Sequence, residues 1–268
     1  MHLTIQHTTT YRFEVAPAYG LQQLRLTPQN GAGQTVIDWA VTIDGGEIQT
    51  EFTDHHQNHV SLISFDPDVP ALTLHCQGSV ETKDLSGIVG KHSGFAPLWV
   101  FMQPTELTRV GPKLRRLMKT VRDDDEDQHI ARLHSLSEHI LEHVPYTRGA
   151  TDALTTAEDA VEHGGGVCQD HAHVFIAAAR AMGYPARYVS GYLLLKDQAQ
   201  QHATHAWAEV HIDPLGWVGF DVSNGMSPDA RYVRVATGAD YRDAAPISGV
   251  RLGDGGEVMS VDIHMHQQ

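Results

Sequence analysis

Cys168 stands in a setting that favours a reactive thiol. It follows three consecutive glycines and a valine, and it opens a segment whose apolar residues recur at helical spacing. A cysteine at a helix N-terminus meets unpaired backbone N–H groups and the positive end of the helix dipole. Both favour the thiolate, which is the form that attacks carbonyl carbons. The alternative interpretation is a small cysteine buried at the start of a helix for packing alone.

Farther along the sequence, a histidine and an aspartate lie on two segments that the sequence pattern predicts to be β-strands. Residues 205–212 place His205 and Trp207 on one face, where the histidine can act as a general base or as the partner of a thiolate. Asp221 ends the apolar run 216–221, and an acid in such a run is costly to bury unless a group such as histidine pairs with it. The alternatives are a surface histidine, since the chain has 19, and an aspartate that caps the following turn.

The turn between these two segments decides whether the histidine and the acid can meet. An odd register, with residues 211 and 217 paired, makes His205 and Asp221 diagonal neighbours on one face of the sheet. An even register turns Asp221 to the opposite face and places Asn224 across from His205, so that Asn224 becomes the partner of the histidine. The catalytic interpretation therefore predicts an odd-length loop or a bulge.

The periodicity of the sequence predicts an α+β protein. Up to residue 84, short runs alternate apolar and polar residues between turn residues, as in a β-sandwich. Strands are expected at residues 23–27, 35–43, 47–53, 59–65 and 71–82. Helical spacing begins after about residue 105, and strand-like runs return near residue 186. Helices followed by antiparallel strands form an α+β order rather than an alternating βαβ one.

Local signals mark the elements that would hold the candidate residues. Helices are expected over residues 128–144, over 156–163, and from Cys168 to a stop at Gly183; strands are expected at 186–195, 205–212 and 217–222. Thr155 and Glu158 fit a capping box at the start of the second of these helices. The His-rich tail, residues 262–268, is expected to fray.

Composition and charge exclude several functional classes. The chain has 268 residues, with 19 Lys plus Arg and 33 Asp plus Glu, for a net charge of −14. Such an acidic chain repels phosphate backbones, so we expect no nucleic-acid partner. No run approaches the ~20 apolar residues of a membrane span, and the N-terminus shows no secretory signal. Only two cysteines are present, Cys76 and Cys168, which excludes a disulfide framework and predicts a cytoplasmic protein.

Taken together, these stretches resemble the transglutaminase-like superfamily of papain-like fold and, more closely, its bacterial branch, which carries an N-terminal β domain. The resemblance is carried by Gly166-Val-Cys-Gln-Asp-His-Ala-His, Met182-Gly-Tyr-Pro-Ala-Arg-Tyr-Val-Ser-Gly-Tyr, His205-Ala-Trp-Ala-Glu-Val and Gly216-Trp-Val-Gly-Phe-Asp. It covers residues 160–225 well. It implies a β-sandwich-like domain over residues 1–100 and a transglutaminase-like catalytic domain over residues 101–268.

The same resemblance implies a mechanism. Cys168 is the expected nucleophile, His205 the general base and acid, and Asp221 the residue that orients the histidine. The expected reaction is acyl transfer on a peptide or isopeptide amide of a peptide or protein substrate through a thioester, with hydrolysis favoured over transamidation and no cofactor needed. The backbone N–H of Cys168 is the expected oxyanion donor, and Gln169 and Trp207 are candidates for a second donor.

The sequence departs from the usual family pattern near the nucleophile and near the acid. His171 replaces an aromatic residue, and Val222 and Ser223 stand where proline and threonine are commoner. These departures leave the three expected catalytic positions intact and affect the shape of the neighbouring pocket.

Two other functions are compatible with these residues. The same fold could serve as a non-catalytic peptide-binding or scaffolding module. Alternatively, Cys and His side chains could hold zinc, and the candidate ligands are Cys168, His171, His173, His202, His205 and His211. We expect no native metal, because C-x-x-C and H-E-x-x-H motifs are absent from the sequence and because His171 and His173 point apart on a helix.

Overall fold

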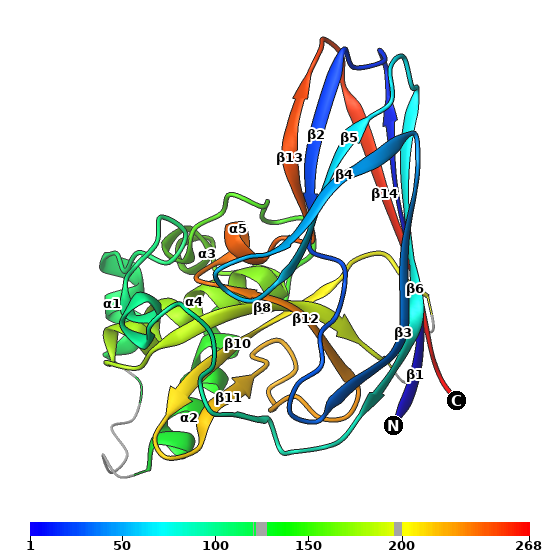
Figure 1. Cartoon of the computed structure of the whole chain (residues 1–268). Helices are drawn as coiled ribbons and strands as arrows, with labels where there is room; N and C mark the ends of the chain where they lie inside the picture. The colour runs from blue at the N-terminus through cyan, green and yellow to red at the C-terminus, as the bar shows by residue number, and fades with distance from the viewer. Residues whose placement is uncertain (120, 122–127, 196–199) are drawn as a thin grey trace.

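The computed structural model describes residues 1–119, 121, 128–195 and 200–268, and Figure 1 shows the chain. The first strands are β1 His2–Phe13, β2 Tyr19–Leu24, β3 Gln34–Asp44, β4 Gly46–Thr53, β5 His59–Phe65, β6 Ala71–Thr82 and β7 Ile88–Gly90. The helices that follow are η1 Leu98–Met102, α1 Pro112–Met118, α2 His129–His143, α3 Ala157–His163 and α4 Cys168–Ala181. The last elements are β8 Ala186–Leu193, β9 Gln200–Gln201, β10 His205–Ile212, β11 Gly216–Phe220, β12 Tyr232–Gly238, α5 Tyr241–Ala244, β13 Ile247–Leu252 and β14 Glu257–Gln267. The α+β order predicted from periodicity is confirmed.

The N-terminal region is built from two antiparallel sheets, in the orders β3-β6-β1-β14-β9 and β13-β2-β5-β4. Alternate residues of β1, among them Leu3, Ile5 and Tyr11, are buried, as the alternating sequence predicted. One hydrophobic cluster draws on both sheets and includes Tyr11, Ile63 and Leu72. The two sheets therefore pack face to face around a shared core.

The end of the chain returns to this region. β14 pairs with β1 and β13 pairs with β2, so the two termini lie close together (Figure 1). The expectation that residues 262–268 fray was wrong, because Ile263 and Met265 alternate with polar residues and are buried in a cluster with Leu3 and Ile5. The domain boundary at residue 100 stays a prediction. Strands from before residue 100 are hydrogen-bonded to strands from after it: β1 to β14, β2 to β13, and β7 to β11.

The second half of the molecule is built on the sheet β12-β8-β10-β11-β7, with α4 against one face. Small residues on that helix, such as Ala172 and Ala177, are buried and allow its backbone to approach the strands closely. Ala206 and Ala208 of β10 belong to the same core. Gly183 follows the helix with a φ of 91°, a left-handed conformation that suits glycine.

The capping box at the start of α3 lies one residue later than expected. Thr156 Oγ1 accepts a hydrogen bond from the Asp159 backbone N–H at 3.2 Å, and the Asp159 carboxylate accepts one from Thr156 N–H at 3.3 Å. Glu158 has a different role, because its carboxylate accepts from the backbone N–H groups of Lys113 and Leu114 at 2.7 and 3.1 Å and so caps α1. None of the helices in the described part of the chain combines the length and the apolar character that crossing a membrane requires.

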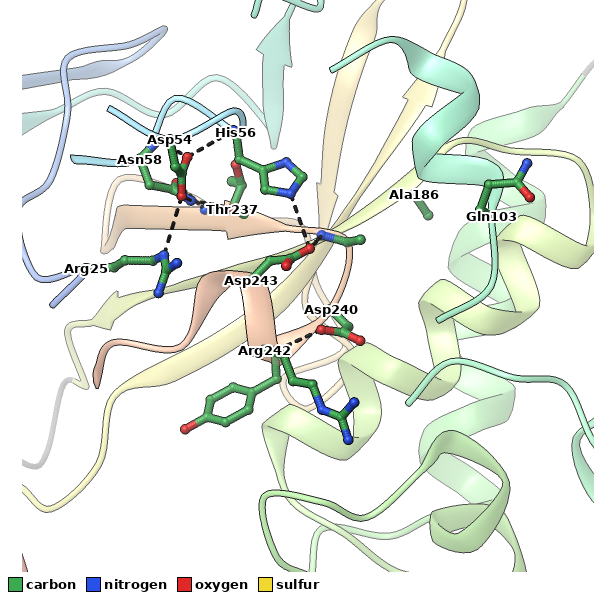
Figure 2. A network of polar contacts seen from close by, with 12 residues as sticks. Arg25, Asp54, His56, Asn58, Gln103, Ala186, Thr237, Asp240, Arg242 and Asp243 are labelled. Atoms are coloured by element: carbon green, nitrogen blue, oxygen red, sulfur yellow. Dashed lines mark hydrogen bonds and ion pairs between the residues drawn. The ribbon is translucent and has the colours of Figure 1, made fainter. Parts of the chain in front are cut away.

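Polar contacts fasten the N-terminal region to the second half, and Figure 2 shows them from close by. The Asn58 side chain bonds both ways to the backbone of Thr237 on β12, donating at 2.7 Å and accepting at 2.8 Å. His56 Nε2 lies 3.2 Å from Asp243 Oδ2 on α5. The loop between β4 and β5 is thereby fixed to the strand and helix that follow the candidate site in the chain.

Candidate active site

Cys168 occupies the first position of α4, as the glycine-rich sequence before it predicted, and its side chain is partly exposed. The approach to the helix is fixed by Asp170, whose Oδ2 accepts from the Val167 backbone N–H at 2.7 Å and from the Thr151 hydroxyl at 2.6 Å. Burial raises the pKa of Asp170, and these two hydrogen bonds oppose that rise. The sulfur therefore stands at a helix N-terminus whose preceding turn is held by a buried acid.

The β10–β11 hairpin has the odd register that the catalytic interpretation required. His211 pairs with Trp217 and Ile212 with Gly216, which leaves residues 213–215 as the loop. Gly216 has a φ of 83°, and a Cβ there would come within 2.1 Å of a backbone oxygen of the neighbouring strand β7, so glycine is needed to close this turn.

This register brings the histidine and the acid together. His205 Nε2 lies 2.6 Å from Asp221 Oδ2, and Asp221 is almost completely buried. The Asp221 carboxylate also accepts from Asn224 Nδ2 and from the Tyr232 hydroxyl, each at 2.7 Å. Burial alone would raise the pKa of Asp221, but these three hydrogen bonds outweigh it and hold the pKa below its usual range. Asn224, expected to replace Asp221 in the even register, instead supports it.

His205 also bonds to the nucleophile candidate. Its ring makes hydrogen bonds to Asp221 and to the Cys168 side chain. Burial would lower the pKa of His205, but the bonds and the charges of these two partners raise it to about 10. Because Nε2 faces Asp221, the other ring nitrogen, Nδ1, is left for the sulfur. The sulfur, the imidazole and the carboxylate thus form one connected chain of hydrogen bonds.

A cleft of about 550 Å³ opens beside Cys168 and His205. Its lining residues are Tyr146, Arg148, Val167, Cys168, Leu193, Leu195, Gln201, His202, Ala203, Thr204, His205, Ser223 and Asn224. The Gln201 side of the cleft is supported from outside the core, because β9 pairs with β14 of the N-terminal region at Gln201 and Ile263. The N-terminal region therefore helps to build one wall of the cleft.

The two candidates for a second oxyanion donor lie away from this space. Among the described residues, those that line the cleft do not include Gln169 or Trp207. Gln169 Nε2 donates to the backbone oxygen of Ala153 at 3.2 Å. The Trp207 ring is buried, with its centroid 6.2 Å from that of His205 and 5.4 Å from that of Tyr232. Trp207 thus packs behind the histidine.

Next to Trp207 on β10, Glu209 forms a buried ion-pair cluster. Its carboxylate lies 2.6 Å from Arg187 Nη2 and 3.0 Å from Arg234 Nε. Burial would raise the pKa of Glu209, but the two guanidinium groups outweigh it and lower the pKa. His205, Trp207 and Glu209 share one face of the strand, and the two positions that follow His205 on that face are filled by an aromatic ring and an ion pair.

The departures from the family pattern meet in the fold. His171 Nδ1 lies 2.7 Å from Ser223 Oγ, and its Nε2 lies 2.6 Å from the backbone oxygen of Val144. Burial lowers the pKa of His171. His171 and Ser223, two of the three departures, are therefore hydrogen-bonded to each other and link α4 to the loop after β11, beside the cleft.

Of the histidines considered as zinc ligands, His202 and His205 line the same cleft, and the others have separate partners. His173 accepts from the backbone N–H of Tyr241 at 3.2 Å, His211 lies 3.8 Å from Asp213, and His202 lines the cleft. Sequence reasoning missed Tyr232, which bonds to Asp221, because its strand is separated from β10 by β8 and no local spacing signals that contact. It also missed Tyr146 and Arg148, which follow α2 and carry no motif.

Comparison with known protein families gives a match for two regions of the chain. Residues 115–222 match the transglutaminase-like superfamily, and residues 3–81 match the bacterial transglutaminase-like N-terminal region. Both regions are therefore similar to bacterial transglutaminase-like proteins, as the resemblance implied.

Particular relatives agree with this. The chain is similar over its whole length to a Cytophaga hutchinsonii protein whose crystal structure was described as that of a candidate cysteine protease, with a TM-score of 0.79, 22% identity and 91% of that chain covered. It is 28% identical to the uncharacterized protein ML0607 of Mycobacterium leprae, with 98% of each chain covered. It is also 28% identical to the uncharacterized protein Rv2569c of Mycobacterium tuberculosis, with 92% of this chain and 86% of that protein covered. The structural likeness establishes the fold.

Proposed function

We propose that this protein catalyses thiol-dependent acyl transfer on peptide or isopeptide amides, with hydrolysis as its main outcome. The observation that carries the proposal is the hydrogen-bonded chain from Cys168 through His205 to Asp221, with Cys168 and His205 lining the cleft. Membership of a transglutaminase-like family is consistent with thiol chemistry in general. The identity of the nucleophile and the choice of acceptor rest on the geometry.

The first half of the reaction transfers the acyl group to the enzyme. The Cys168 sulfur attacks the carbonyl carbon of the amide, and its proton passes to His205. The backbone N–H of Cys168, at the start of α4, faces the negative charge that develops on the carbonyl oxygen. The C–N bond then breaks, His205 returns its proton to the leaving amine, and a thioester remains on the sulfur.

The second half returns the enzyme to its starting state. A water molecule gives a proton to His205 and attacks the thioester carbon, and collapse of the adduct releases the carboxylic acid and restores the thiol. An amine in place of water would give transamidation. Polar side chains of Gln201, Thr204 and Asn224 line the cleft and can hold water close to the thioester, which favours hydrolysis.

The role of Asp221 is to hold the imidazole. Its carboxylate fixes the ring orientation through Nε2. Its hydrogen bond and negative charge also stabilise the imidazolium form of His205, which is why the pKa of His205 is raised to about 10. Asn224 and Tyr232 keep the buried carboxylate in place and charged. A buried acid with three donors suits this task, because it remains an acceptor throughout the cycle.

A cleavage assay on a peptide library, run with and without an added amine acceptor, tests the proposal. His205→Gln should abolish turnover, while His211→Gln, on the same strand and the same face but outside the hydrogen-bonded chain, should leave it unchanged. Cleavage that persists in the His205 variant would refute the mechanism. Failure of the wild-type chain to cleave any peptide, combined with saturable peptide binding, would favour the non-catalytic binding module.

A further inference from the structure

A cluster of metal-ligating side chains lies on α2, outside the candidate active site. His139, Glu142 and His143 are spaced i, i+3 and i+4, so they share one face at the C-terminal end of this helix. Each offers one ligand atom, and these atoms all lie within 4.8 Å of one another. The two imidazole centroids are 4.2 Å apart, and His139 Nδ1 lies 3.9 Å from Glu142 Oε2.

Both imidazoles are oriented by backbone carbonyl groups. His143 Nδ1 lies 2.9 Å from the backbone oxygen of His139, so Nδ1 carries the proton and Nε2 keeps its lone pair. The His139 ring hydrogen-bonds to the backbone oxygen of Leu117 on α1. A histidine that binds a metal through one nitrogen usually donates its other N–H to a carbonyl or a carboxylate, which fixes the tautomer and the ring orientation. Both histidines of the cluster have such a carbonyl partner.

The electrostatic setting favours a cation. The cluster occupies the carbonyl end of α2, where the helix dipole places partial negative charge, and His143 is the only basic residue of that last turn. Glu142 adds a formal negative charge, and its side chain is 73% exposed, so it can rotate toward a bound ion with little obstruction.

We propose that His139, Glu142 and His143 form a binding site for a divalent transition-metal ion of the zinc class. Two imidazoles and one carboxylate are a ligand set that zinc accepts, with the remaining position open to water or to a ligand from another molecule. Metal–ligand bonds of ~2.0–2.1 Å in a tetrahedral site place the donors ~3.4 Å apart. Closing the cluster from its present spacing therefore needs a movement of roughly 1 Å, which side-chain rotation supplies.

Such a site would be independent of the proposed catalysis. It uses none of the residues that line the cleft. It lies immediately before Val144, whose backbone oxygen bonds to His171, and three residues before Tyr146, which lines the cleft. A bound ion would link three side chains of the turn that leads into that wall, and so would stabilise the end of α2.

Isothermal titration calorimetry, with zinc added to the untagged 268-residue chain, tests this site. The Cys168→Ala variant is used throughout, so that zinc bound by the thiol at the cleft does not contribute. We expect one zinc ion per chain, and affinity at least about tenfold weaker after His143→Ala, because even partners outside the ligand set typically change metal affinity 10–100-fold. His163→Ala, at an exposed histidine ending α3, is the matched control and should bind as the parent does.

Two further measurements make the outcome decisive. Circular dichroism of the His143 variant checks that α2 still forms, and Glu142→Gln should weaken binding while keeping the size of the side chain. The proposal is overturned if the parent binds no zinc in a defined ratio, or if His143→Ala binds zinc as tightly as the parent does.

Discussion

Replacing Tyr232 with phenylalanine removes one of the three hydrogen bonds that keep Asp221 charged. The Tyr232 hydroxyl donates to Asp221 Oδ2 at 2.7 Å, and both groups are buried. A hydrogen bond to a charged group contributes about 1.5–3 kcal/mol. Since His205 and Asn224 still donate to the carboxylate, we take the lower end, which corresponds to a rise of about one unit in the pKa of Asp221 at 1.36 kcal/mol per unit.

The sign of the pH effect follows from the direction of that shift. The pKa of Asp221 in the folded protein is lowered, so its charge contributes stability at neutral pH that is lost as the pH falls through the folded value. Tyr232→Phe raises the folded pKa, so the same loss begins at a higher pH. The acid limb of kcat/KM should move up by about one pH unit, while kcat/KM at neutral pH changes little, because the carboxylate stays ionised there.

The assay is a pH profile of kcat/KM on a fluorogenic peptide identified by the library assay. Tyr184→Phe is the matched control, because it removes a hydrogen bond of 2.8 Å between a buried tyrosine and His129, and neither of these residues lines the cleft. Both variants should lose similar stability, but only Tyr232→Phe should shift the acid limb. An unshifted profile in Tyr232→Phe would refute the idea that this hydroxyl tunes Asp221.

The remaining predictions concern the thiols, the buried ion pair and acid stability. Iodoacetamide should modify Cys168 far faster than Cys76, because Cys76 is 2% exposed and burial raises its pKa to about 12; equal rates by peptide mass spectrometry would contradict this. Glu209→Gln should lower the free energy of unfolding by about 3–5 kcal/mol, because it leaves the buried Arg187 and the partly exposed Arg234 without their carboxylate; a loss below about 1 kcal/mol in urea titration would show that the cluster is not important for stability. Burial lowers the pKa of His7 from 6.5 to about 4. Below pH 6.5, His7 therefore binds a proton more readily in the unfolded chain than in the folded protein, and the free energy of unfolding should fall by about 2 kcal/mol between pH 7 and pH 5. His7→Gln should reduce that fall, and a pH dependence equal to that of the wild type would exclude His7 as its source.

Local signals in the sequence were sufficient to place the elements that carry the site. The strands at residues 59–65, 71–82 and 205–212 begin and end where alternation predicted, because turn residues bound each run. The hairpin register followed from requiring His205 and Asp221 on one face, and the structure shows that register. The cysteine at the start of α4 was signalled by the glycines before it.

Contacts between distant segments could not be predicted in this way. β13 and β14 pair with β2 and β1, which lie more than two hundred residues earlier in the chain, and no local pattern records such a partner. The tail was expected to fray because it is rich in histidine, but Ile263 and Met265 alternate with polar residues there and are buried. Tyr232, the first residue of β12, reaches Asp221, which follows β11, only because both strands belong to one folded sheet.

The position of the capping box shows the limit of motif matching. Thr155 and Glu158 satisfy the pattern, but so do the neighbouring Thr156 and Asp159, and the tertiary structure selects between them. Glu158 is drawn to the N-terminus of α1, where its carboxylate accepts two backbone N–H groups. A choice between adjacent capping pairs therefore depends on a helix that lies elsewhere in the sequence.

The central claim, that Cys168 carries the acyl group, is tested most directly by trapping the intermediate. The wild-type chain is mixed with p-nitrophenyl acetate, quenched in acid and digested, and the peptides are weighed by mass spectrometry. We predict one acetyl group on the peptide that contains Cys168, removable by hydroxylamine, and none on that peptide in Cys168→Ala or after His205→Gln. Release of p-nitrophenol at the wild-type rate by Cys168→Ala, or acetylation only at other residues, would contradict the account.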